Sequence, residues 1–175
     1  MICLLGFSAF LRIDEVLNIR VKDIAFFRTY MAITIPKCKN DQTRAGNRIY
    51  VAEIQSRYCP VFHTASYIHA LCLQPEHYIV CKLVRTRKGH RAVGSHRMSD
   101  SQIRKNFTNT VNKCFPNVNL GLHSMRSGGA SAAAKHNVSD RLISKHGRWA
   151  STKSRDGYIK DSVENRLHVT KNLGL

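Results

Sequence analysis

The spacing of apolar residues predicts a chain made mostly of helices. From Met1 to about Ile19, apolar positions recur at mostly helical spacing, which predicts one largely buried helix. No capping residue precedes this segment, so we expect the helix to begin upstream and the chain to be truncated at its N-terminus. Capping and turn residues frame the other predicted helices: Pro60 to about Leu73, Ser99 or Asp100 to about Cys114, Leu122 to about His136, Ser139 to a C-terminal glycine at Gly147, a short helix capped by Ser151 that carries Tyr158, and a final one after the capping pair Asp161 and Glu164 that ends near Gly174.

Two segments rich in β-branched and aromatic residues predict a β-hairpin. Tyr30 to Ile35 and Arg48 to Ala52 are the strands, and the polar stretch between them is a long basic tip. Tyr78 to Val84 is expected to be a further short strand, and Arg85 to Arg97 a basic loop. No repeat or linker interrupts the pattern. We therefore expect a mainly α fold with a small antiparallel β-sheet against one side (α+β), in one domain over residues 1–175.

Net charge points to a polyanionic partner. The chain has 28 Lys and Arg against 11 Asp and Glu, a formal net charge of +17. Each phosphate that a basic side chain neutralises releases condensed counterions, so nucleic acid is the expected partner. No apolar run reaches the roughly 18 residues needed to span a bilayer, so no membrane partner is expected. Charge alone does not separate a DNA enzyme from a basic RNA-binding protein.

The cysteines and carboxylates do not indicate a cofactor. The six cysteines form no Cys-x-x-Cys pair, which favours free thiols in a reducing compartment. Cys59 and His63 have ligand-like spacing, but no second pair accompanies them. No carboxylate cluster suited to Mg²⁺ and no P-loop are evident. We expect no metal, no cofactor and no small-molecule substrate.

Three pairs of residues carry candidate chemistry: Arg12 with Glu15, His123 with Arg126, and Trp149 with Tyr158. A charge inside an apolar helix needs a partner, so an ion pair between Arg12 and Glu15, or an Arg12 side chain that extends outward to solvent, would explain the first pair without any catalytic role. Residues three apart share a helix face, and near a helix N-terminus that face can bind an anion. Taken alone, the second pair is as well explained by an ordinary basic helix start as by an anion site. A lone tyrosine on a short helix is more often a packing residue than a nucleophile.

The order of these pairs resembles the catalytic domain of the tyrosine recombinase (phage integrase) family. An Arg-x-x-Glu pair is followed by a basic β-hairpin, then by His-x-x-Arg, and then by Trp and Tyr nine residues apart. The resemblance covers nearly the whole chain. It implies the fold of that catalytic domain, without the amino-terminal domain with which most members clamp DNA.

The resemblance also implies a role for each matching residue: Arg12 and Arg126 bind the scissile phosphate, Lys39 is the lysine of the β-hairpin, His123 is the histidine of His-x-x-Arg, and Tyr158 is the nucleophile. Trp149 stands where most members have a second histidine, and some members have tryptophan there. Glu15 and His146 are supporting residues. The family acts on double-stranded DNA as a tetramer, so self-association is implied too.

The chain departs from the family pattern at several positions. Most members read Leu-x-Gly-His before the nucleophile, whereas this chain reads Lys145-His146-Gly147-Arg148-Trp149. His146 lies twelve residues before Tyr158 and is not equated with the family histidine; we expect it to cap carbonyls or approach the DNA backbone. Lys37 is close enough to Lys39 to replace it as the hairpin lysine.

Two stretches look most like recombinases of eukaryotic mobile elements, the DIRS-type retrotransposons and Cryptons. These are residues 123–134 and 145–161. A mobile element of that kind implies a nuclear protein; a protein from another source would be cytoplasmic.

The residue types suit attack on a phosphodiester. The pentacoordinate transition state carries extra negative charge on the non-bridging oxygens, which two permanently charged arginines can bind. Tyrosine has a pKa of about 10 and must lose a proton to attack, for which His123 is the candidate acceptor. Lys39 can protonate the departing 5′ oxygen, and Trp149 can donate only one hydrogen bond.

The function expected from this resemblance is site-specific DNA cleavage and rejoining through a 3′-phosphotyrosyl intermediate. A type IB topoisomerase uses a similar set of groups and is the alternative among enzymes. A non-catalytic DNA-binding protein derived from a mobile element is the alternative outside enzymes.

Overall fold

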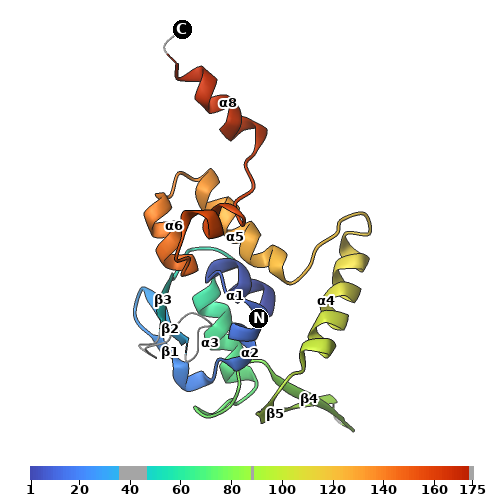
Figure 1. Cartoon of the computed structure of the whole chain (residues 1–175). Helices are drawn as coiled ribbons and strands as arrows, with labels where there is room; N and C mark the ends of the chain where they lie inside the picture. The colour runs from blue at the N-terminus through green and yellow to red at the C-terminus, as the bar shows by residue number, and fades with distance from the viewer. Residues whose placement is uncertain (36–46, 88, 174–175) are drawn as a thin grey trace.

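The computed structural model describes residues 1–35, 47–87 and 89–173. They form a mainly helical fold with small antiparallel sheets, so the expected fold class is confirmed. Figure 1 shows helices packed around α1 (Ile2–Ser8), with a sheet on one side of them. Within the described residues, no helix is long and apolar enough to cross a membrane.

The larger sheet contains the predicted hairpin. Strands β2 (Tyr30–Ile35) and β3 (Asn47–Ala52) pair antiparallel, and β1 (Ile24–Phe26) adds to the outer edge of β2. In this register Ile33 lies opposite Ile49, and both are buried. The hairpin tip, with Lys37 and Lys39, lies outside the described residues.

The single N-terminal helix expected over Met1 to Ile19 is wrong. The structure has two helices, α1 and α2 (Ile13–Asn18), because Phe10 adopts a left-handed backbone with φ of 48°. Arg12 is therefore the N-cap of α2 and not a residue inside a helix. The Glu15 carboxylate accepts a hydrogen bond from the Arg12 backbone N–H at 2.8 Å, which helps to start α2.

The expected loop over Arg85 to Arg97 is also wrong. It contributes β5 (Gly89–Arg97), which pairs antiparallel with β4 (Cys81–Thr86) in a separate hairpin. Both strands carry many basic side chains, so the sequence lacks the alternation of apolar and polar residues that predicts a half-buried strand. Hydrogen bonds between the two strands nevertheless order the segment.

The other helices lie close to their predicted positions. They are α3 (Pro60–Ala70), α4 (Asp100–Cys114), α5 (His123–Lys135), α6 (Asp140–Gly147), α7 (Thr152–Asp156) and α8 (Val163–Lys171). The hydroxyl of Ser99 accepts a hydrogen bond from the Gln102 N–H and caps α4, while that of Ser151 accepts one from Ser154 and caps α7. Figure 1 shows α8 standing clear of the rest of the molecule.

Two details of the C-terminal third differ from expectation. Gly147 is the last residue of α6, and the left-handed conformation falls on Arg148, with φ of 55°. Tyr158 lies two residues after the end of α7 and not on that helix.

A large and a small apolar cluster divide the interior. The large one joins α1, α2 and α3 to the β1–β3 sheet, with Leu5, Leu17 and Ile33 fully buried. The small one joins the turn after α1 to α5 and α6, and Tyr158 packs against it. The second cluster therefore supports the segment that carries the candidate nucleophile.

Candidate active site

One face of α5 holds the segment that carries Tyr158. The Nε2 atom of His123 lies 3.0 Å from the Tyr158 hydroxyl. One and two helical turns further along, the hydroxyls of Ser127 and Ser131 donate to the Tyr158 carbonyl oxygen, and Ser131 also accepts from the Lys160 N–H at 2.8 Å. Residues four apart share a helix face, so one face of α5 contacts both the side-chain hydroxyl and the main-chain carbonyl of Tyr158.

The imidazole of His123 is suited to accept a proton. Burial lowers the pKa of His123 from its ordinary value of 6.5, and the positive charges of Arg126, Arg12 and Arg104 lower it further. The ring is therefore largely neutral at neutral pH. A neutral imidazole has one nitrogen lone pair, which the Tyr158 O–H can approach.

Arg126 lies beneath the aromatic rings of the site. The guanidinium carbon lies 4.6 Å from the centre of the Trp149 ring and 5.0 Å from that of Tyr158, and the residue is fully buried. Its Nη2 donates to the Gly147 carbonyl at 2.6 Å, and its Nη1 donates to that of Phe10. Burial lowers the pKa of Arg126 to about 10, so it remains charged at neutral pH.

Two buried donors of the site have no hydrogen-bond partner among the described residues. They are the Nε atom of Arg126 and the Nε1 atom of Trp149. Buried donors without a partner are rare in native proteins. Both donors therefore have the capacity to bind an acceptor that is not part of the described chain.

Gly147 allows Trp149 to lie over Arg126. A Cβ atom at Gly147 would come within 2.1 Å of the indole ring, so any side chain there would displace it. The Trp149 ring centre lies 5.1 Å from that of Tyr158. The tryptophan therefore connects the end of α6 with the segment that carries Tyr158.

A buried carboxylate connects the arginines. Glu15 accepts hydrogen bonds from Arg12 Nη1 at 3.3 Å and from Arg148 Nη2 at 2.7 Å, while Arg126 Nη1 lies 3.9 Å away. The Arg12 side chain is one-third exposed, whereas those of Glu15 and Arg148 are almost fully buried. The ion pair expected between Arg12 and Glu15 is therefore part of a larger network.

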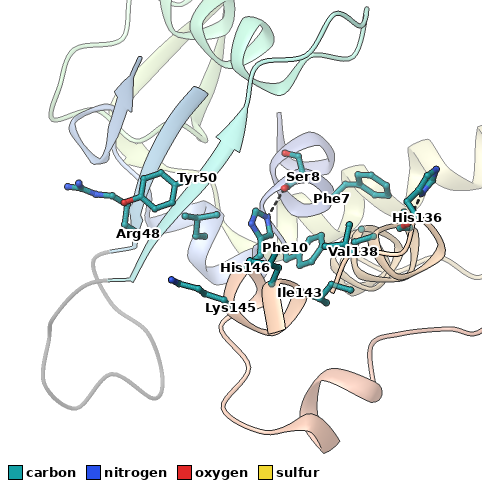
Figure 2. Close-up of a pocket in the computed structure, with 15 residues that line it drawn as sticks. Phe7, Ser8, Phe10, Arg48, Tyr50, His136, Val138, Ile143, Lys145 and His146 are labelled. Carbon is teal, nitrogen blue, oxygen red and sulfur yellow. Dashed lines mark hydrogen bonds between the residues drawn. The ribbon is translucent and has the colours of Figure 1, made fainter. Parts of the chain in front are cut away.

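His146 bonds to the end of α1. Figure 2 shows its ring directed at Ser8, and its Nε2 lies 2.9 Å from the Ser8 carbonyl oxygen. Burial lowers the pKa of His146, which favours the neutral ring. This contact is of the carbonyl-capping kind and lies beside an apolar groove of about 630 Å³ between α1, β3, α5 and α6.

The structure thus brings together five of the six predicted catalytic residues: Arg12, His123, Arg126, Trp149 and Tyr158, with Glu15 and His146 next to them. The sixth, Lys39, lies outside the described residues. No group of three or more His, Cys, Asp or Glu that could hold a metal ion occurs in the described part of the chain.

Sequence reasoning missed two basic residues near the site. Arg148 pairs with Glu15, and Arg104 on α4 contributes to the positive potential at His123. The signal for Arg148 was its place directly before Trp149, where the family pattern has glycine. The signal for Arg104 was absent, because the path of α4 relative to α5 depends on the tertiary fold.

The family models give one match that spans nearly the whole chain. The model described as "Phage integrase family" matches residues 1–165. The comparison with curated proteins gives no match.

Solved structures of similar fold come from DNA recombinases. The XerH site-specific recombinase bound to its difH substrate is 17% identical with a TM-score of 0.64, over 99% of this chain and 46% of that one. XerA recombinase is 16% identical with a TM-score of 0.69, over 98% and 56%. The Tn1549 transposon integrase in complex with circular intermediate DNA is 13% identical with a TM-score of 0.57, over 97% and 55%. The chain spans about half the length of these proteins.

Proposed function

The chain belongs to the phage integrase family, and from this and the site geometry we propose that it cleaves and rejoins double-stranded DNA through a covalent bond to Tyr158. The solved structures support the fold of a tyrosine recombinase catalytic domain. The reaction on DNA, the target and the assembly are our proposals.

The contact between His123 and Tyr158 carries the proposal. In the first step the phenol proton passes to His123, and the phenolate oxygen forms a bond to the scissile phosphorus as the bond to the 5′ oxygen breaks. The product is a 3′-phosphotyrosyl linkage and a free 5′ hydroxyl. Attack by a 5′ hydroxyl reverses the step and rejoins a strand.

Three further residues would stabilise the transition state. Arg12 and Arg126 would donate to the non-bridging oxygens, and the Trp149 indole N–H would add one hydrogen bond. The unpartnered donors of Arg126 and Trp149 support this assignment. Lys39 would protonate the departing 5′ oxygen, because an alkoxide is a poor leaving group.

We propose that the protein self-associates on DNA. Helix α8 stands clear of the body and exposes Val163 and Leu167, and a groove lined largely by apolar residues lies between α1, β3, α5 and α6. Apolar surfaces of this kind are typical of contacts between proteins. A second copy is the partner that we expect for them.

We also propose a mobile-element origin of the DIRS or Crypton kind, and with it a nuclear location. The support is the sequence of residues 123–134 and 145–161, where Trp149 replaces the more common histidine. A mobile-element recombinase must reach chromosomal DNA to act on it.

A covalent-adduct assay tests the proposed function. The chain is incubated with a library of nicked duplexes whose sequence around the nick is randomised, so that the cleaved end diffuses away and the adduct accumulates. We expect DNA-linked protein that survives denaturation, with the DNA attached to Tyr158 in the mapped peptide. Tyr158→Phe should retain DNA binding and form no adduct.

Two results would contradict the proposal. One is an adduct on Tyr30, Tyr50 or Tyr67, and the other is strict dependence of cleavage on Mg²⁺. A type IB topoisomerase would also form the adduct, but would relax supercoiled DNA without joining two duplexes.

A further inference from the structure

Arg148 has an unusual backbone and an unusual place. Its φ of 55° and ψ of 41° are left-handed, a conformation that residues other than glycine adopt rarely and at a cost in free energy. Glycine at this position, as in the common family pattern, would remove that cost. Its side chain is nevertheless a guanidinium that is only 5% exposed.

The Arg148 guanidinium contacts one carboxylate and two main-chain carbonyls. Its Nη2 lies 2.7 Å from Glu15 Oε2, the shortest contact between Glu15 and any guanidinium among the described residues. The same guanidinium bonds the carbonyls of His146 and Phe10 at 3.2 and 3.4 Å. The side chain therefore faces the interior of the protein.

Charge balance explains why such a contact is useful. Arg12, Arg126 and Arg148 carry three positive charges against the one negative charge of Glu15, a net charge of +2 for the four side chains. Without Arg148 the net charge of these side chains would be +1, and the carboxylate would interact more strongly with Arg12 and Arg126. The positive potential that these two arginines present to a phosphate would then be lower.

We propose that Arg148 is a positioning residue that holds the Glu15 carboxylate and so keeps Arg12 and Arg126 available to the scissile phosphate. This role rests on the proposed function, because it assumes that both arginines bind phosphate. Arg148 itself touches no DNA. It acts only through Glu15.

A suppression experiment tests this role. Arg148→Gln removes the positive charge but leaves a polar side chain that can donate hydrogen bonds, whereas Arg148→Lys keeps the charge. Glu15→Gln removes the carboxylate charge, while its amide oxygen can still cap α2. Cleavage of nicked duplex is measured at saturating DNA. Arg148→Gln should slow cleavage by roughly ten- to a hundredfold, as coupling within one charged network implies, and Arg148→Lys should slow it much less. Adding Glu15→Gln to Arg148→Gln should recover most of the lost rate.

A binding measurement gives the second readout. For Tyr158→Phe protein, the salt dependence of affinity for a plain duplex counts the phosphate contacts. Arg148→Gln should reduce the slope of log K against log salt by about one, and Glu15→Gln should restore it. If the wild type forms no adduct but these slopes change as expected, the proposed cleavage fails, and what remains is the effect of Arg148 on phosphate binding by Arg12 and Arg126.

Other results would overturn the role of Arg148. A wild type that forms the adduct while Glu15→Gln further slows Arg148→Gln would make Arg148 a structural residue. So would unchanged cleavage and salt slope in Arg148→Gln. If both Arg148→Gln and Arg148→Ala fail to fold by circular dichroism while Arg148→Lys folds, the residue is again structural and the proposal is wrong.

Discussion

The Nε2 atom of His123 and the hydroxyl oxygen of Tyr158 are 3.0 Å apart, although 35 residues separate them in the chain. The contact depends on α5, whose hydroxyls at Ser127 and Ser131 hold the main chain of Tyr158. A base within hydrogen-bond reach of the proton that it removes is the first geometric requirement of general-base catalysis. The contact between His123 and Tyr158 meets this requirement.

The pH dependence of cleavage should report His123. The base must be neutral, so the rate should fall as pH falls through the pKa of His123, which burial and nearby arginines hold below 6.5. Arg104→Gln removes one of those positive charges, should raise that pKa, and should move the acidic limb of the rate profile to higher pH. Single-turnover cleavage between pH 5 and 8 measures the shift.

Lys105→Gln is the matched control for Arg104→Gln. It removes the same charge from an exposed position of the same helix, but Lys105 is not among the groups that act on His123. The acidic limb of the pH–rate profile of Lys105→Gln should coincide with that of the wild type. A rate without any acidic limb would show that His123 is not the acceptor.

The sequence predicted elements whose signals are local. Residue type and position alone predicted Pro60 at the start of α3, and Ser99 or Asp100 as the cap of α4, where the structure has Ser99. The hairpin of β2 and β3 followed from β-branched residues on either side of a polar stretch. In each case the residues that define the element lie within a few positions of one another.

The missed features depend on tertiary contacts. Phe10 takes its left-handed turn where its ring packs against His146 and Trp149, residues more than 130 positions away. The left-handed conformation falls on Arg148 and not on Gly147, and Glu15 binds the Arg148 guanidinium across 133 positions of sequence. The family resemblance predicted the candidate catalytic residues. At Arg148 the chain departs from the family pattern, so the resemblance predicted no role for that residue.

Two adjacent glycines of α5 should respond in opposite ways to alanine. A Cβ at Gly129 would lie 2.2 Å from the Phe7 carbonyl oxygen, so Gly129→Ala must push α5 from α1 and should reduce the free energy of unfolding by about 2–3 kcal/mol. A Cβ at Gly128 would lie 3.5 Å from the Phe7 ring, an ordinary contact. Gly128→Ala should therefore increase the free energy of unfolding by about 0.5–1 kcal/mol through helix propensity.

Urea unfolding followed by circular dichroism measures both changes. The dependence of the free energy of unfolding on urea concentration should have the same slope as in the wild type. The transition midpoints then report the differences in stability directly. Equal destabilisation by the two substitutions would mean that α1 and α5 do not approach closely at Gly129.

Lys39, and not Lys37, should protonate the leaving 5′ oxygen. A substrate with sulfur at the bridging 5′ position has a leaving group that needs no proton. It should restore cleavage to Lys39→Ala and should leave Arg126→Ala slow, because the arginine acts on the non-bridging oxygens. Adduct formation on oxygen and sulfur substrates gives the comparison.

Lys37→Ala is the control, with little effect expected on either substrate. Similar rescue of Lys39→Ala and Arg126→Ala would mean that Lys39 is not the acid. Rescue of Lys37→Ala instead would transfer the role to Lys37.

The final prediction concerns Trp149 and His146, which lie three residues apart around the end of α6. Among the described residues the Trp149 indole N–H is buried without a partner, and its ring covers Arg126. Trp149→Ala should therefore lose both the proposed donor to phosphate and the packing against Tyr158. A hydrogen bond to a charged group is worth about 1.5–3 kcal/mol, or roughly 10- to 150-fold in rate if it forms only in the transition state. Trp149→His should keep substantial activity, because an imidazole can make the same donation.

His146→Ala should be the milder change, because its Nε2 is already engaged with the Ser8 carbonyl. Its loss should lower the free energy of unfolding more than it lowers the single-turnover cleavage rate. If His146→Ala abolishes cleavage while Trp149→Ala is tolerated, the alignment with the family is displaced by one helical turn. His146 would then be the catalytic histidine, and Trp149 would serve only to pack the end of α6 against Arg126 and Tyr158.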